Sequence, residues 1–125
     1  MKLSLDSGAG IVVTGAGPGW IRVGTEEVRD NVVLAVGRVL AGFAPRGFDA
    51  LGAADFASLL EHRPEVVIFG TGAVQRFIAP RTLAPLLDAR VGVETMATLA
   101  ACRTFNILSG EGRRVVAALI VREPD

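Results

Sequence analysis

Arg103 and Asn106 are the side chains in this chain that are best suited to bind a charged group. They lie three residues apart in a predicted helix, so they share one helix face. Because that helix is otherwise apolar, the guanidinium requires a carboxylate, and Glu94 and Glu111 are the nearest in the sequence. Two interpretations stay open: a partly buried Arg–Glu pair that fixes the helix on a sheet, or an anion site that includes Arg103.

The turn Gly70-Thr71-Gly72 follows a predicted buried strand, and its backbone amides would be the second part of such an anion site. A dinucleotide site is an alternative, since Glu94 follows the glycine turn at about the sequence separation at which dinucleotide-binding folds place the acid that binds the ribose. The third glycine of that motif is missing, because Gln75 stands there. A tight turn that needs a positive φ explains the glycines without any ligand.

A right-handed crossover would bring the glycine turn and the strand that ends near Glu94 together. The start of the following helix near Thr95 would lie at the same place. The candidate pocket or anion site therefore comprises Gly70, Thr71, Gly72, Glu94, Thr95, Arg103 and Asn106.

Nucleophilic and metal chemistry have little support in the sequence. Cys102 is the only cysteine and His62 the only histidine. At helical spacing Cys102 shares an apolar stripe with Ala101 and Phe105, which is typical of an inert, buried thiol. Without a cluster of Cys and His we expect no metal site. We also expect no catalytic residue and no cofactor, so a protein without enzymatic activity is favoured.

Length and charge exclude further classes of protein. The chain has 125 residues, half of them hydrophobic, with 13 basic and 13 acidic side chains. This predicts a single domain over residues 1–125, a monomer or weak dimer. Nucleic acid is excluded as a partner because no basic cluster exists. The apolar runs are strand-length, so no transmembrane segment is expected. Asp6 interrupts a secretory pattern, and a lone cysteine fits the cytoplasm.

The elements that must position these residues follow from hydrophobic periodicity and from Gly and Pro positions. Strands are predicted at 11–13 and 20–23 (a hairpin with a glycine-rich loop), 31–40, 65–69, 91–93 and 115–121. Helices are predicted at 53–62, 80–87 and from about 97 to 109, the last capped by Thr95 or Thr98 and stopped at Gly110. We expect the last helix to be the most buried, with apolar residues on both faces and Phe105 in the core.

The alternation of helix and strand after residue 52 predicts an α/β fold. We expect one compact layered domain with a central mixed, mostly parallel sheet, flanking helices and the N-terminal β-hairpin region packed at one side.

The motifs Gly70-Thr71-Gly72, 92–98 (GVETMAT), 101–106 (ACRTFN), 111–114 (EGRR) and 117–120 (AALI) together resemble a small α/β family of unknown function that was first described structurally in archaea. Its eukaryotic relatives include a mitochondrial respiratory complex I assembly factor and an adipogenesis-associated protein. The resemblance implies a compact domain with a mixed sheet and no established catalytic residues. Phe105 stands where Tyr is common in the family, and Ala97 where Asp is common.

Two functions follow from the residues and the resemblance together. The first is a non-catalytic protein-interaction or assembly-factor-like module with a protein partner of unknown identity. The second is a small-molecule or anion-binding protein, with or without enzymatic activity, that has a pocket where Gly70-Thr71-Gly72 faces Glu94 and Arg103.

Overall fold

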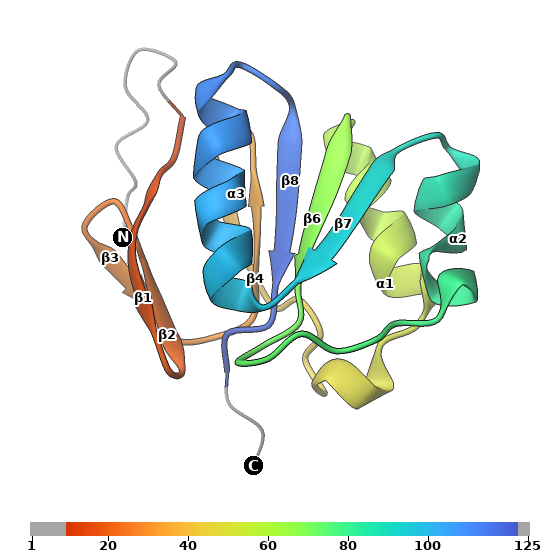
Figure 1. The fold of residues 1–125 in the computed structure, drawn as a ribbon, viewed down its shortest axis with the longest axis horizontal. Coiled ribbons are helices and arrows are strands. Elements are labelled where there is room, and N and C mark those ends of the chain that lie inside the picture. The colour runs from red at the N-terminus through yellow and green to blue at the C-terminus, as the bar shows by residue number, and fades with distance from the viewer. Residues whose placement is uncertain (1–9, 123–125) are drawn as a thin grey trace.

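The computed structural model describes residues 10–122. It contains a five-stranded sheet, which lies at the centre of the molecule (Figure 1). The strand order is β5 (Arg38–Ala41), β4 (Val32–Ala35), β8 (Val115–Leu119), β6 (Val66–Gly70) and β7 (Gly92–Met96). The three strands β8, β6 and β7 are parallel, while β4 pairs antiparallel with both β8 and β5. The mixed sheet predicted from the alternation of elements is confirmed.

The N-terminal strands form a second, smaller sheet. It contains β1 (Val13–Gly17), β2 (Trp20–Val23) and β3 (Glu26–Val28), all antiparallel. Pro18-Gly19 makes the first turn, with Gly19 at a φ of 78°, so the predicted hairpin is confirmed. Its first strand was predicted too early, at 11–13, because Gly15, Ala16 and Gly17 pair with β2 instead of forming a loop. The short strand β3 was not predicted, because its two glutamates hide the strand pattern.

The single strand predicted over 31–40 is wrong. The segment forms two strands, β4 and β5, joined by Val36 and Gly37. Gly37 has a φ of 68°, in the left-handed region that a two-residue hairpin turn requires. The β-branched residues on either side make the run look continuous in the sequence.

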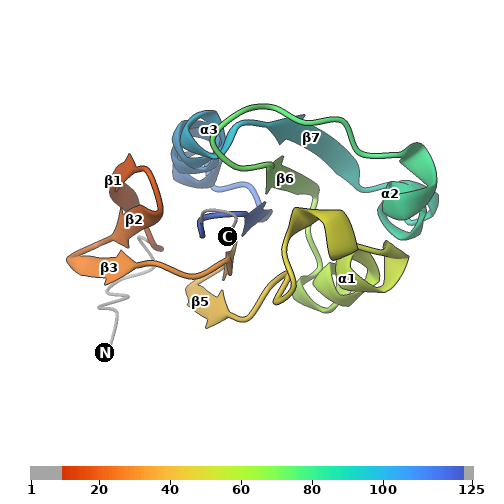
Figure 2. The same cartoon turned by 90° about the horizontal axis from the view of Figure 1, so that it is seen from below.

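Helices cover both faces of the central sheet (Figure 2). One face carries α3 (Thr98–Gly110) together with the small sheet. The other face carries α1 (Ala53–Ala57), the 3-10 helix η3 (Ser58–His62) and α2 (Pro80–Asp88). A further 3-10 turn, η2 (Phe48–Ala50), precedes α1. The fold is therefore layered, with the small sheet at one side, as predicted.

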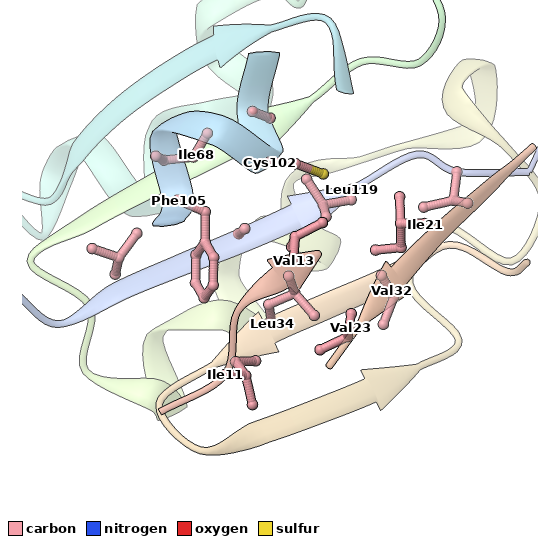
Figure 3. Close-up of a cluster of buried hydrophobic side chains, with 14 of the residues drawn as sticks. Ile11, Val13, Ile21, Val23, Val32, Leu34, Ile68, Cys102, Phe105 and Leu119 are labelled. Atoms are coloured by element: carbon pink, nitrogen blue, oxygen red, sulfur yellow. The ribbon is translucent and has the colours of Figure 1, made fainter. Parts of the chain in front are cut away.

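The central strands supply two separate hydrophobic cores, because alternate residues of a strand point to opposite faces. Ile68 belongs to the core beneath α3 and the small sheet, whereas Val67 and Phe69 belong to the core beneath α1 and α2. Every residue of β6 and β8 is buried, as expected for strands that are covered on both faces. Figure 3 shows the first core between α3, the small sheet and the central sheet.

The helix α3 buries the most residues of the three α-helices, as predicted. Phe105 is almost completely buried at its centre. Apolar residues occupy both faces of α3, as predicted, but the second face is not buried, since Leu99 is 51% exposed and Ile107 is 62% exposed. Within residues 10–122, this second face of α3 belongs to neither hydrophobic core. No helix within residues 10–122 is both long and apolar enough to cross a membrane.

Candidate functional site

The turn Gly70-Thr71-Gly72 lies where β6 meets the start of α3. Gly72 has a φ of 114°, which confirms that the turn requires a positive φ. Gly70 is needed for a different reason. A Cβ at this position would lie 2.9 Å from Thr98 Oγ1 and 3.1 Å from Thr98 Cα. The absence of a side chain therefore lets the helix approach the strand.

The polar groups of this turn are bonded within the protein. The Thr71 N–H donates to the Met96 carbonyl (2.8 Å), and the Gly72 N–H donates to Thr98 Oγ1 (2.9 Å). Thr98 Oγ1 in turn donates to the Ile120 carbonyl (2.7 Å). The strand ends are therefore adjacent, as predicted, but the Thr71 and Gly72 amides are already engaged.

The predicted cap of α3 by Thr95 or Thr98 is wrong. The residue before the helix is Ala97, and its side chain makes no capping hydrogen bond. Thr98 is the first helical residue, and its hydroxyl joins the glycine turn to the end of β8 instead. Nothing in the sequence around Thr98 indicates that its hydroxyl would connect two distant segments rather than cap the helix.

Arg103 does not form the expected ion pair with Glu94 or Glu111. Both Arg103 and Glu94 are exposed, and within residues 10–122 Arg103 has neither an ion pair nor a hydrogen bond. Arg103 lies four residues from both Leu99 and Ile107, on the outer stripe of α3. Since water solvates a guanidinium there, no protein carboxylate is required.

Asn106 connects α3 to the small sheet. Its Oδ1 accepts from the Val13 N–H (2.9 Å), and its Nδ2 donates to the Val13 carbonyl (2.8 Å). The amide thus continues the hydrogen bonding of β1 as a neighbouring strand would. The structure brings Gly70, Thr71, Gly72 and Thr95 into one neighbourhood, with Glu94 on the opposite face of β7, whereas the amide of Asn106 is occupied by β1.

Cys102 is buried in the core beneath α3. Burial raises the pKa of its thiol from 9.0 to about 11, and the charge of Arg103 opposes this only in part. Such a thiol stays protonated at neutral pH, which is the state of an unreactive core cysteine. Within the described part of the chain, no group of three or more His, Cys, Asp or Glu side chains could hold a metal ion.

Asn31 is a buried polar residue that sequence reasoning missed. Its Oδ1 accepts from the Val121 N–H (2.7 Å) and the Arg122 N–H (2.9 Å), while its Nδ2 donates to the Ala44 carbonyl (3.1 Å). Asn31 thereby fixes the segment after β8 beside the start of β4. Its position at the start of a β-branched run is the only signal in the sequence, and it is a weak one.

A groove of about 490 Å³ lies beside the edge strand β7. It is lined by Gln75, Arg76, Phe77, Ile78, Leu83, Leu87, Val93 and Thr95. These residues come from the segment 71–79, from α2 and from β7. Only Thr95 belongs to the predicted site, because the segment 71–79 has no helical or strand period that would place it.

The segment 71–79 is held in place at two points. Thr71 Oγ1 donates to the Val74 carbonyl (2.8 Å) and accepts from the Arg76 N–H (3.1 Å). The Arg76 guanidinium lies 3.9 Å from the centre of the Phe48 ring and 2.8 Å from an Asp49 oxygen. Cation–π contact and ion pair together fix the arginine. The groove therefore has a wall fixed by internal contacts.

Large apolar side chains of this wall are exposed. Phe77 is 82% exposed and Val74 is 65% exposed, while Leu87 of α2 is about half exposed across the groove. Single exposed apolar residues are common on protein surfaces. Here Phe77 and Leu87 line the same groove, and a clustered, rimmed apolar surface is typical of a binding site.

Comparison with known proteins agrees with this fold. A family model described as "Protein of unknown function (DUF498/DUF598)" matches residues 13–120. A crystal structure of a protein from Bordetella parapertussis superimposes with a TM-score of 0.81 at 36% identity, over 95% of this chain and 99% of that chain.

Two curated relatives carry different descriptions. An uncharacterised protein of Rhodobacter capsulatus is 33% identical over 109 residues, which are 86% of this chain and 82% of that protein. NADH dehydrogenase [ubiquinone] 1 alpha subcomplex assembly factor 3 of Mus musculus is 42% identical over 62 residues, or 50% of this chain. The match spans about a third (34%) of the mouse protein's length. Because the family model covers residues 13–120, the chain belongs to the DUF498/DUF598 family of proteins of unknown function.

Proposed function

We propose that the protein is a non-catalytic protein-interaction module that resembles an assembly factor in its mode of action. The observation that carries this proposal is the exposed apolar lining of the groove, above all Phe77 on one side and Leu87 on the other. Interface centres are enriched in aromatic side chains that are buried on binding. A wall that is already fixed by Thr71 and Arg76 loses little conformational entropy when a partner binds.

The relatives support the same proposal at a coarser level. Half of this chain matches NADH dehydrogenase [ubiquinone] 1 alpha subcomplex assembly factor 3 of several animals. Assembly factors act through surfaces that contact other proteins, which is the property proposed here. We place this module in the cytoplasm, since its lone cysteine is buried and fits a reducing compartment. We expect it to be a monomer or weak dimer.

The alternative, an anion or small-molecule site at the glycine turn, has less support. Its proposed donors, the Thr71 and Gly72 amides, already donate to Met96 and Thr98. A small molecule would instead bind in the groove, where Gln75, Arg76 and Thr95 are the polar residues. Titration with small-molecule fragments, observed by NMR shifts of the Thr95 amide, would detect such a ligand.

Site-specific photo-crosslinking tests the proposed function. A photoreactive phenylalanine analogue at position 77, in the protein expressed in its own cells, should capture one reproducible partner. The same analogue at Val36, the exposed tip of the β4–β5 hairpin, is the matched control. Equal sets of captured proteins at both positions, or none at position 77, would contradict the proposal.

A variant extends this test. Phe77→Ser should remove the interaction without changing the thermal midpoint, because the side chain is largely exposed in the free protein. Leu99→Ser, on the outer face of α3, makes a comparable change elsewhere and should leave the interaction intact.

A further inference from the structure

The edge strand β7 has backbone groups that point away from the sheet. The Gly92 N–H donates to the Glu65 carbonyl (3.1 Å), and the Met96 carbonyl accepts from Thr71 (2.8 Å). Gly92, Glu94 and Met96 therefore face β6, and the intervening Val93 and Thr95 face outward. Among the residues that the structure describes, only the Gln75 side chain forms a hydrogen bond to these outward backbone groups, at 3.4 Å from the Thr95 carbonyl.

The side chains of β7 divide between two environments. Val93 and Thr95 line the groove next to α2, while Glu94 lies on the opposite face of the strand and is exposed. A strand added beside β7 would place every second side chain in the groove, against Leu83 and Leu87. The side chain between them would lie next to Glu94.

We propose that β7 binds an extended segment of another protein as an additional antiparallel strand. The segment has apolar side chains opposite Val93 and Thr95, and a Lys or Arg opposite Glu94. Backbone hydrogen bonds to Val93 and Thr95 hold the segment, and the groove and Glu94 select its sequence. This inference rests on the proposed function and names the class of partner and the mode of binding.

A second copy of the chain does not fit this edge. Antiparallel self-pairing of the outward residues allows three registers. Centring on Glu94 places two glutamates directly opposite each other, which is unfavourable. Centring on Val93 requires the Val91 N–H, which donates to Leu86. Centring on Thr95 requires Ala97, whose carbonyl accepts the first hydrogen bond of α3.

Synthetic peptides test the charge preference. The probes are blocked seven-residue peptides with the sequence Ser-Thr-Val-X-Val-Thr-Ser, in which X is Lys, Ser or Glu. Binding, measured by fluorescence anisotropy, should be about three- to tenfold tighter for Lys than for Glu, the range expected for cross-strand charge pairs. Glu94→Lys should reverse the order. Glu111→Lys, an equal change of charge at the end of α3, should preserve it.

Backbone methylation of the Lys peptide tests strand addition without altering the protein. N-methylation of either valine, whose N–H would face β7, should weaken binding by more than tenfold. N-methylation of the central lysine, whose N–H points away, should have little effect. Equal effects at all three positions, or no binding at millimolar concentration, would overturn strand addition.

The two proposals fail in different ways. If the probe at position 77 captures a partner while the methylation pattern is absent, the interaction module stands and strand addition is wrong. A concentration-dependent dimer that is abolished by Thr95→Pro would show a second copy on β7 and would also overturn this inference. Loss of capture at position 77 would contradict the proposed function itself.

Discussion

Gly70 shows how one missing side chain allows a helix to begin directly on a strand. The residue has no unusual backbone conformation, yet Thr98 Oγ1, Thr98 Cα and a Leu119 methyl group all lie close to the position of a Cβ. Since Thr98 Oγ1 also accepts from Gly72 and donates to Ile120, a displacement of Thr98 would disturb two hydrogen bonds.

We therefore expect Gly70→Ala to lower the free energy of unfolding by about 1–3 kcal/mol, through overpacking against a backbone that cannot move freely. Gly110→Ala is the matched control, because a Cβ there meets no atom within 4 Å. Because Gly110 is the last residue of α3, this substitution should raise the free energy of unfolding by roughly 0.5–1 kcal/mol. Urea unfolding of both variants measures the difference, and equal effects would show that the close approach is unimportant.

The thiol of Cys102 gives a second prediction at this scale. Burial raises its pKa to about 11, above the value of 9.0 in the unfolded chain. The folded state therefore retains a proton that the unfolded state loses between pH 9 and pH 11. The stabilising contribution is complete below pH 9 and declines as the pH rises towards 11.

The sequence makes this effect measurable, because the chain has no tyrosine and Lys2 is its only lysine. Over pH 9–11 the free energy of unfolding should fall more steeply for the natural protein than for Cys102→Ala. If the free energy of unfolding changed with pH in the same way for both proteins, the raised pKa of Cys102 would be contradicted. At neutral pH a thiol reagent should react slowly with the folded protein and rapidly after denaturation.

At the scale of elements, Asn106 determines how the small sheet sits on α3. Its side-chain amide exchanges two hydrogen bonds with Val13, a buried residue of β1. Replacement by an apolar side chain would leave both backbone groups of Val13 without partners in a region with little access to water.

Asn106→Leu should therefore destabilise the protein by about 1–3 kcal/mol. Hydrogen exchange should accelerate at Val13 and its neighbours in β1 and β2 before it changes in β6. Ile107→Ala, one residue further along α3 on the exposed side, is the control and should have almost no effect. Uniform acceleration in all strands would show that Asn106 supports global stability only.

The helices and strands were largely predictable, because the spacing of hydrophobic residues and the positions of Gly and Pro are local properties of the sequence. The buried strand β6 and the helix that starts at Pro80 show this, and so does the burial of Phe105. The split at Gly37 was missed since valines on both sides favour one long strand.

The site was less predictable, because it depends on contacts between distant segments. Arg103 was expected in a pair, but the helix rotates it to the outer stripe with Leu99 and Ile107. The groove is formed by the segment 71–79, α2 and β7 together. The residues next to Phe77 in the sequence do not indicate that its side chain would line a groove. Exposure of an apolar side chain is decided by packing, which no local pattern records.

At the scale of the whole molecule, two apolar layers share one sheet. Alternate residues of β6 and β8 enter the two cores, so neither core is complete unless both strands are in place. The small sheet contributes Val13, Ile21 and Val23 to one core only, and Ile11, just before β1, joins the same core. We therefore infer a single cooperative domain in which the small sheet and the distant helices α1 and α2 unfold together.

Trp20 of β2 is the only tryptophan and reports from the small sheet. Phe56 lies in the other core, in edge-to-face contact with Phe69 at 5.1 Å between ring centres. Phe56→Leu should cost roughly 1–2 kcal/mol, less than complete truncation of a buried phenylalanine. Because the cores share β6 and β8, Trp20 fluorescence and far-UV circular dichroism should shift to lower urea by the same amount. Phe77→Leu, at an exposed position, should shift neither signal. A Trp20 transition that stays in place while the dichroism moves would show that the small sheet unfolds independently.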